Sequence, residues 1–237
     1  MYYRFFSFVI PAHNEEKIIK RTIRCLQTLE YPADRYEIIV VENGSTDETY
    51  GTAVPLESLN TRVYSSEKGV SRARNYGFGK TSPLMEWVIF MDCDVFIAPS
   101  FLSELNTYLA VHPRVGYGAT TVNLDSTTLA ARFWSWFNNL TYRLFKVLFT
   151  VHIIRRDIAE KISYDEELIS GEDIQYGKDA ARLTKYFFMP TKSVRSSPRR
   201  FEKKGYLWMF FSNLYHGATM FVLPKSMLKK MDWEVIR

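Results

Sequence analysis

The chain has 237 residues, 46% of them hydrophobic and 24% charged, so it is long and apolar enough to bury a core, and general disorder is excluded. Its formal charge of +5 at pH 7 favours anionic partners, which include nucleic acid, phosphate-bearing substrates and acidic membrane surfaces, and charge alone does not separate these three. The two cysteines, Cys25 and Cys93, lie in unlike contexts and support neither a disulfide framework nor a zinc site, so a reducing compartment, the cytoplasm, is expected.

Three short apolar runs are predicted to form strands that are buried on both faces. They are residues 5–10 (FFSFVI), 36–41 (YEIIVV) and 87–91 (WVIFM), and such runs are typical of a largely parallel sheet. The first run is too short, and is broken too early, to be a signal peptide. The mature chain is therefore expected to begin at this N-terminus.

Helices are predicted between and after these strands. Residues 14–32 carry apolar side chains at helical spacing, acids in the first turn and a proline just past the end. Another helix is predicted to begin near Pro99. The alternation of strands and helices predicts an α/β fold that is doubly wound, with a mostly parallel, mixed sheet. Ligands bind such sheets outside the carboxyl ends of the strands.

Two aspartates follow the third predicted strand directly. Asp92 and Asp94 are two positions apart, so on extended backbone their side chains point to the same side, and Cys93 points away. Both carboxylates can face one hard cation, or one can face the cation and the other a sugar hydroxyl. A strand-end turn with solvated acids is the other interpretation of this motif taken alone.

Polar residues also follow the first two strands. Glu42 and Asn43 can hydrogen-bond the imide edge of uracil or a ribose, while Asn43 and Gly44 are equally well explained as turn residues. After the first strand, the acids of PAHNEE can favour a helix N-terminus that Asn14 caps.

A basic segment precedes the third strand. SEKGVSRARNYG supplies Lys68, Arg72, Arg74 and Asn75, and a diphosphate near the aspartates would need cationic partners of this kind, since arginine presents forked donors that match phosphate oxygens. A solvated helix face is the alternative for Lys68 and Arg72.

The order of five motifs resembles a known family. FVIPAHNEE, IIVVENGSTDET, KGVSRARNYG, FMDCD and SGEDIQYG look like the successive signatures of the family 2 glycosyltransferases, an inverting group with the GT-A fold, and the resemblance spans residues 5–200. It implies a nucleotide-sugar donor, Mg2+ or Mn2+ at Asp92 and Asp94, and direct displacement at the anomeric carbon.

The resemblance also implies roles for individual residues. The nucleotide-base pocket would be lined by Pro11, Ala12, His13 and Glu15. Arg74 and Asn75 match the family's Arg-Asn pair. Glu42 stands where the family usually has aspartate, so the base stays open between a favoured UDP-sugar and a GDP-sugar.

The segment YDEELISGEDIQYG carries the pair Glu172 and Asp173. An inverting transfer needs one carboxylate that takes the proton from the acceptor hydroxyl. By resemblance this general base is Asp173, and Glu172 orients or binds the acceptor. On this segment alone, both are explained as acids at a helix N-terminus.

The C-terminal half is rich in aromatic residues. Residues 129–149 and 206–223 are broken by charged or polar residues, so amphipathic helices in a membrane interface are predicted rather than spanning helices. Helices packed on the sheet or on a second subunit are the alternative. The resemblance favours a lipid-linked, polyprenyl-phosphate or surface-glycan acceptor, with the chain peripheral on the inner face of the membrane.

The last basic segment, SVRSSPRRFEKKGY, contains Arg199 and Arg200, which are expected to close over the diphosphate. The Gln-x-x-Arg-Trp motif of many family members is absent, which argues against a processive polysaccharide synthase. His216 could complete the metal shell as a neutral imidazole, although a lone histidine in an apolar helix is usually a packed residue.

Two other function classes compete with a glycosyltransferase. A sugar nucleotidyltransferase would need a glycine-rich, lysine-bearing phosphate loop after the first strand, and PAHNEE has none. A non-catalytic nucleotide- or nucleic-acid-binding protein would have no use for acids at three strand or helix ends. We therefore expect a single GT-A domain, with residues 1–115 binding the donor and residues 116–237 the acceptor, and no nucleic-acid partner.

Overall fold

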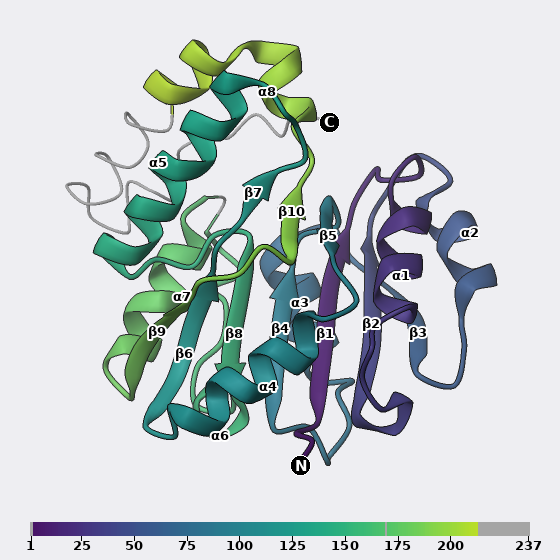
Figure 1. Cartoon of the computed structure of the whole chain (residues 1–237). Coiled ribbons are helices and arrows are strands. Elements are labelled where there is room, and N and C mark those ends of the chain that lie inside the picture. The colour runs from purple at the N-terminus through teal and green to yellow at the C-terminus, as the bar shows by residue number, and fades with distance from the viewer. Residues whose placement is uncertain (1, 169, 213–237) are drawn as a thin grey trace.

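A seven-stranded sheet forms the centre of the chain in a computed structural model that describes residues 2–168 and 170–212 (Figure 1). In spatial order its strands are β3 (Thr61–Ser66), β2 (Tyr36–Asn43), β1 (Phe6–Ala12), β4 (Trp87–Met91), β8 (Val151–Arg155), β6 (Val115–Thr120) and β9 (Lys185–Met189). β8 runs antiparallel to both of its neighbours, and the other neighbouring strands are parallel. The predicted mixed, mostly parallel sheet is confirmed.

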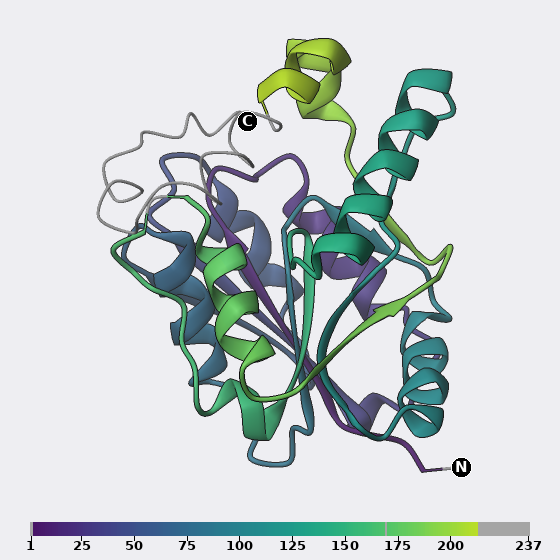
Figure 2. The same cartoon turned by 90° about the vertical axis from the view of Figure 1, so that its left-hand side faces the viewer.

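Helices cover both faces of this sheet (Figures 1 and 2). One face is covered by α1 (Ile19–Gln27), α2 (Thr49–Ala53) and α4 (Phe101–Val111), whose buried side chains join one core cluster. The other face is covered by α3 (Val70–Phe78), α6 (Arg156–Ala159) and α7 (Glu172–Ala181). Short 3-10 turns, η1 (Ala33–Arg35) and η2 (Val54–Leu56), flank β2 and α2.

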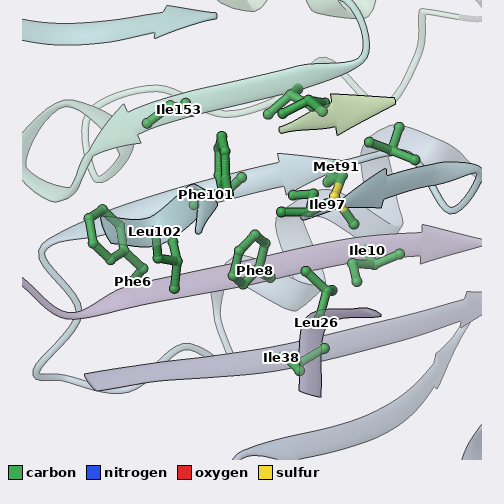
Figure 3. Packing of buried hydrophobic residues seen from close by; sticks show 14 of the residues in the cluster. Phe6, Phe8, Ile10, Leu26, Ile38, Met91, Ile97, Phe101, Leu102 and Ile153 are labelled. Carbon is green, nitrogen blue, oxygen red and sulfur yellow. The ribbon is translucent and has the colours of Figure 1, made fainter. Parts of the chain in front are cut away.

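The central strand β1 is buried along its whole length, as its apolar run predicted. Phe6, Phe8 and Ile10 point to the face where Leu26 and Leu102 pack (Figure 3). Because side chains alternate along a strand, Val9 points to the opposite face. Each fully buried side chain of this size stabilises the fold by about 1.5–3 kcal/mol relative to its exposed state, so this strand anchors both helical layers.

A glycine allows α3 to lie close to the sheet. A Cβ atom on Gly77 would come within 2.5 Å of Val9 Cγ1 and 3.0 Å of Val41 Cγ2, and atoms at such a distance clash. The glycine in RNYG therefore sets how closely α3 approaches β1 and β2. This close approach carries Arg74, one turn earlier in α3, against the end of β4.

The first helix begins later than the sequence predicted. Asn14 has a left-handed backbone (φ 53°), and its Oδ1 accepts a hydrogen bond of 2.7 Å from the backbone N–H of Thr46. α1 starts only at Ile19, and no side chain caps it. Asn14 therefore joins the loops after β1 and β2 instead of capping the helix, because its amide finds a partner across the sheet edge.

A smaller sheet, two helices and a helical segment at residues 206–212 complete the described chain. β5 (Val95–Ile97), β10 (Val194–Ser196) and β7 (Asn123–Leu124) form this sheet. α5 (Leu129–Phe145) and α8 (Arg199–Lys204) extend beyond the carboxyl ends of the parallel strands (Figures 1 and 2). Trp134 of α5 packs on Phe201 of α8 and on Met209. The aromatic C-terminal half therefore stands over the edge where a ligand is expected.

Candidate active site

The predicted polar residues gather where β1, β2 and β4 end. Ala12 pairs with Glu42 in the parallel register of β1 and β2, so the turns after both strands leave the sheet at the same level. The Asp-x-Asp segment follows β4, which is the other neighbour of β1. The strand order therefore brings these motifs to one edge of the sheet.

Arg74 lies at the centre of the site, with 4% of its side chain exposed. Its Nη2 donates to Asp92 Oδ1 at 3.0 Å, and its Nη1 donates to Glu172 Oε1 at 2.9 Å. Burial lowers the pKa of Arg74, but Tyr164 and the two carboxylates outweigh this and raise it, so the guanidinium stays charged. The sequence predicted a diphosphate contact here. In this structure Arg74 joins two carboxylates, one from each of the predicted halves of the site.

Burial and the charge of Arg74 act in opposite directions on the pKa of Asp92. Its desolvation by the surrounding protein raises its pKa, Arg74 lowers it and Asp94 raises it, with a resulting pKa of about 6. Since 38% of its side chain still reaches solvent, water screens part of these interactions. A nearby cation would favour the ionised form of Asp92.

The donor atoms at this edge fit a weakly held divalent cation. Asp92 and Asp94 offer hard carboxylate oxygens, which suit Mg2+ or Mn2+. No cluster of three or more His, Cys, Asp or Glu suited to a metal occurs in the described chain. Other ligands would have to come from water and from phosphate oxygens, and the third predicted ligand, His216, lies outside the described residues.

Arg199 connects α8 to the same edge. Its Nη2 lies 2.5 Å from Glu15 Oε1 and 3.5 Å from Asp94 Oδ2. Of the seven buried side-chain nitrogen and oxygen atoms that have no hydrogen-bond partner within the described residues, four belong to this edge: Glu15 Oε2 and the Nε atoms of Arg74, Arg199 and Arg200. Such unpartnered polar groups are rare in folded proteins, so this concentration indicates a binding site.

The residues predicted for the base pocket hold the strand ends together. Pro11 and Ala12 lie inside β1 and are buried. His13 Nδ1 is 2.9 Å from the carbonyl oxygen of Asn43, and Asn43 Nδ2 donates to the carbonyl of Ala12 at 3.0 Å. Glu42 accepts hydrogen bonds from the backbone of the following turn and, at 2.9 Å, from a hydroxyl of β3. In this structure Glu42 and Asn43 therefore act as turn residues that bond to neighbouring protein groups.

Asn75 also bonds to protein. Its Nδ2 donates to the carbonyl of Tyr164 and its Oδ1 accepts from the N–H of Tyr164, both at 2.9 Å, and Nδ2 also contacts Glu166 at 3.0 Å. Lys68, by contrast, is exposed. Arg72 is also partly exposed, with 42% of its side chain accessible, and pairs with Glu67 and, at 3.3 Å, with Glu166.

Glu172 and Asp173 begin α7, as the sequence predicted. Gly171 precedes them with a φ of 79°, which glycine adopts easily. Asp173 Oδ1 accepts from the N–H of Ile174 at 2.7 Å. Burial, and then the charge of Glu172, raise the pKa of Asp173 well above its ordinary range. A carboxylate with a raised pKa is a stronger proton acceptor, which suits a general base.

Sequence reasoning missed two buried residues below this site, His152 and Tyr164. Tyr164 lies against Arg74, and His152 contacts the Tyr164 hydroxyl. His152 stands in the apolar run VHII, and Tyr164 is the first residue of the segment YDEELISGEDIQYG, where the sequence assigned it no role. Only their packing shows that they belong to the site.

Solved structures share this architecture. The chain superposes on a crystal structure of TarS from Staphylococcus aureus with a TM-score of 0.68 and 22% identity, covering 84% of this chain and 62% of that one. It matches the mannosyltransferase PcManGT from Pyrobaculum calidifontis, in complex with GDP-Man and Mn2+, with a TM-score of 0.65 and 19% identity over 83% of this chain and 57% of that one. Fold and site together thus define a protein of the GT-A class.

Sequence comparison places the chain more narrowly. The model of glycosyl transferase family 2 matches residues 7–160, well over half of the chain, and the chain belongs to this family. Glycosyltransferase AglE of Haloferax volcanii is 28% identical over 194 residues, which are 74% of this chain and 61% of that protein. A dolichyl N-acetyl-glucosaminyl phosphate glucuronosyltransferase of Methanococcus voltae is 23% identical over 228 residues, 84% of this chain and 70% of that protein. The chain thus spans about 61% of AglE and 62% of the crystallised TarS segment 1–349.

Proposed function

We propose that this protein transfers a sugar from a nucleoside diphosphate donor to an acceptor hydroxyl with inversion at the anomeric carbon. The observation that carries the proposal is the double ion pair of Arg74 with Asp92 and Glu172. The two ion pairs hold Asp92, which suits the donor side, beside Glu172 and Asp173, which suit the acceptor side. In this proposal residues 1–115 bind the donor and residues 116–237 the acceptor.

On the donor side, Asp92 and Asp94 would hold Mg2+ or Mn2+ against the diphosphate, and the cation would neutralise the leaving nucleotide. PcManGT, which shares the fold, was solved with GDP-Man and Mn2+, and this supports the assignment. Arg199 is bound to Glu15 and Asp94 in this structure. We propose that Arg199, with Arg200, exchanges these partners for phosphate oxygens when the donor binds.

On the acceptor side, Asp173 takes the proton of the acceptor hydroxyl while that oxygen bonds to the anomeric carbon. The bond from the anomeric carbon to the diphosphate breaks in the same step, and its electron pair leaves with the nucleotide. Glu172, fixed by Arg74 at 2.9 Å, orients the acceptor. Attack opposite to the leaving group inverts the anomeric configuration.

Metal-dependent nucleotide release tests this function directly. We expect purified protein to release UDP or GDP from nucleotide sugars in the presence of Mn2+ or Mg2+, and EDTA to abolish the release until metal is restored. Metal lowers the barrier by stabilising charge on the leaving diphosphate. Formation of nucleoside triphosphate from pyrophosphate and nucleotide sugar would instead identify a nucleotidyltransferase, and a product of retained configuration would contradict direct displacement.

α5 carries an apolar stripe that faces away from the core. Its members repeat every three or four residues, which places them on one helix face: Leu129, Phe133, Trp136, Leu140 and Leu144. Their exposed fractions run from 38% to 80%, while Trp134 and Tyr142 bury the opposite face. We define these five residues as the α5 stripe.

Basic residues accompany the α5 stripe. Arg132, Arg143 and Lys146 are exposed along α5 and at its end. Within the described residues no helix is both long and apolar enough to cross a bilayer. We propose that the stripe lies in the surface of an anionic membrane, on the inner face, and brings the site to a lipid-linked acceptor. The relative from Methanococcus voltae, whose name specifies a dolichyl phosphate substrate, supports this choice.

Membrane contact predicts binding to vesicles that depends on the stripe. The wild type is expected to sediment with phosphatidylserine vesicles and to be partly released by salt, since apolar burial and cationic attraction both contribute. Changing Phe133 and Trp136 to Glu should weaken binding at least about tenfold, because each side chain contributes about 1.5 kcal/mol or more when buried.

Leu59 offers a matched control for this experiment, because it is fully exposed outside the α5 stripe. Leu59→Glu should leave vesicle binding unchanged. If the wild type does not bind at low salt, the alternative holds, in which the α5 stripe packs against protein.

A further inference from the structure

Tyr164 lies directly beneath the double ion pair of Arg74. Its side chain is 2% exposed. The centre of its ring is 5.0 Å from the guanidinium carbon of Arg74, within the range of a cation–π contact. On this ring Tyr176 stacks at 4.0 Å between ring centres, with an angle of 7° between the planes. Arg74 therefore lies over the ring of Tyr164, and this ring stacks in turn on Tyr176.

The hydroxyl of Tyr164 is anchored to the sheet. His152 Nε2 is 2.7 Å from the carbonyl oxygen of Phe149, and a carbonyl only accepts, so Nε2 carries the proton. The other ring nitrogen, Nδ1, then accepts from the Tyr164 hydroxyl at 2.5 Å. Burial, and next the charge of Arg74, lower the pKa of His152 well below its ordinary value, which is consistent with this neutral tautomer.

Two hydrogen bonds hold the backbone of Tyr164 in place. Asn75, the residue after Arg74, bonds to both its N–H and its carbonyl at 2.9 Å. The residue directly before the strand that carries His152 also reaches Asp92, because the carbonyl of Thr150 accepts from the Asp92 N–H at 3.2 Å. A closed series of contacts thus runs from Asp92 through Arg74, Tyr164 and His152 back to the backbone of Asp92.

We propose that Tyr164 is a positioning residue for the transfer reaction: anchored by His152 and Asn75, its ring holds Arg74 where one guanidinium orients both Asp92 and Glu172. This inference rests on the proposed function. Tyr164 itself contacts neither carboxylate through a hydrogen bond in this structure and acts through Arg74. Small displacements of catalytic groups cost large factors in rate, so loosening this ring should slow turnover even though the fold is kept.

Tyr176 provides a matched control. It belongs to the same stack, is equally buried at 2% exposure, and its hydroxyl makes no hydrogen bond with the described part of the chain. A substitution at Tyr176 therefore removes the same atoms from the same layer. It differs in leaving the contacts to Arg74 and His152 in place.

The test compares the series Tyr164→Phe and Tyr164→Leu with Tyr176→Phe and Tyr176→Leu. For Tyr164→Phe we expect kcat to fall about tenfold, and for Tyr164→Leu about a hundredfold, since loss of precise orientation costs factors of this size. The KM for the donor should change less than kcat. Tyr164→Phe leaves the buried Nδ1 of His152 without its partner, so its melting temperature should fall below that of Tyr176→Phe, and every variant is assayed well below its melting temperature. The Tyr176 variants should keep kcat within about threefold of the wild type. If Tyr164→Leu fails to fold, Tyr164→Phe decides alone.

Equal losses of kcat in the two series, measured well below the melting temperature of each variant, would overturn the inference and leave the proposed function standing. A wild type that shows no metal-dependent nucleotide release would overturn the proposed function, and this inference with it.

Discussion

Asp173→Asn is expected to lower the rate of sugar transfer at least about a hundredfold, the low end of what a positioned general base supplies. The substitution keeps the shape of the side chain and removes its ability to accept a proton. Affinity for the metal-bound nucleotide should stay near that of the wild type, because the proton belongs to the acceptor and the base contributes only as that oxygen attacks. Turnover with saturating acceptor and calorimetric donor binding separate the two effects.

The raised pKa of Asp173 provides a folding control for this experiment. The folded state holds the proton of this carboxyl to higher pH than the unfolded chain does. Stability is therefore lost as pH rises from the unfolded pKa, about 3.9, through the raised folded value. Asparagine does not titrate, so Asp173→Asn should be at least as stable as the wild type at neutral pH while it is much less active. A loss of activity that follows a loss of stability would contradict the role of a base.

Glu172→Gln supplies the comparison on the acceptor side. Its bond to Arg74 orients the group and does not remove a proton, so the rate should fall less than in Asp173→Asn.

The pH profile of kcat/KM for the wild type should fall on the acid side as Asp173 becomes protonated, at a higher pH than an ordinary carboxylate would give. Near-normal turnover of Asp173→Asn would overturn its assignment.

Asp94→Asn is expected to remove most of the metal-dependent part of nucleotide binding and to lower turnover about a hundredfold, because metal stabilisation of a leaving diphosphate is worth several kcal/mol. With two protein carboxylates at the site, loss of one leaves a neutral amide that binds a hard cation poorly. Titration of UDP and GDP with and without Mn2+ measures the effect by calorimetry.

Asp125 is the control for the charge change. It also pairs with arginines, at 3.0 Å from Arg21 and 3.3 Å from Arg195, but it follows β7 instead of β4. Asp125→Asn should therefore retain metal-dependent nucleotide binding. If Asp94→Asn kept full metal-dependent affinity for the nucleotide, Asp94 would not be a metal ligand. Its role would then be its ion pair with Arg199.

Local sequence features were sufficient to predict three of the seven strands of the large sheet and the edge at which the predicted motifs lie. The three apolar runs became β1, β2 and β4, and Gly171 with its two acids became the start of α7. These elements depend on side-chain periodicity and on caps, which are properties of neighbouring residues. The start of α1 was mispredicted because Asn14 finds its partner at Thr46, a residue that local patterns do not place beside it.

By itself, then, the sequence determined the strands β1, β2 and β4, the order of the motifs and the carboxyl-end edge that carries them, because parallel strands leave the sheet at one level. Only the tertiary structure decided the partners of the charged groups. Gly77 lets α3 approach the sheet, so Arg74 reaches Asp92 and Glu172, and Arg199 meets Glu15 across 184 positions of sequence. A guanidinium fits phosphate and carboxylate oxygens equally well, and the choice between them depends on which oxygen the packed chain brings within about 3 Å.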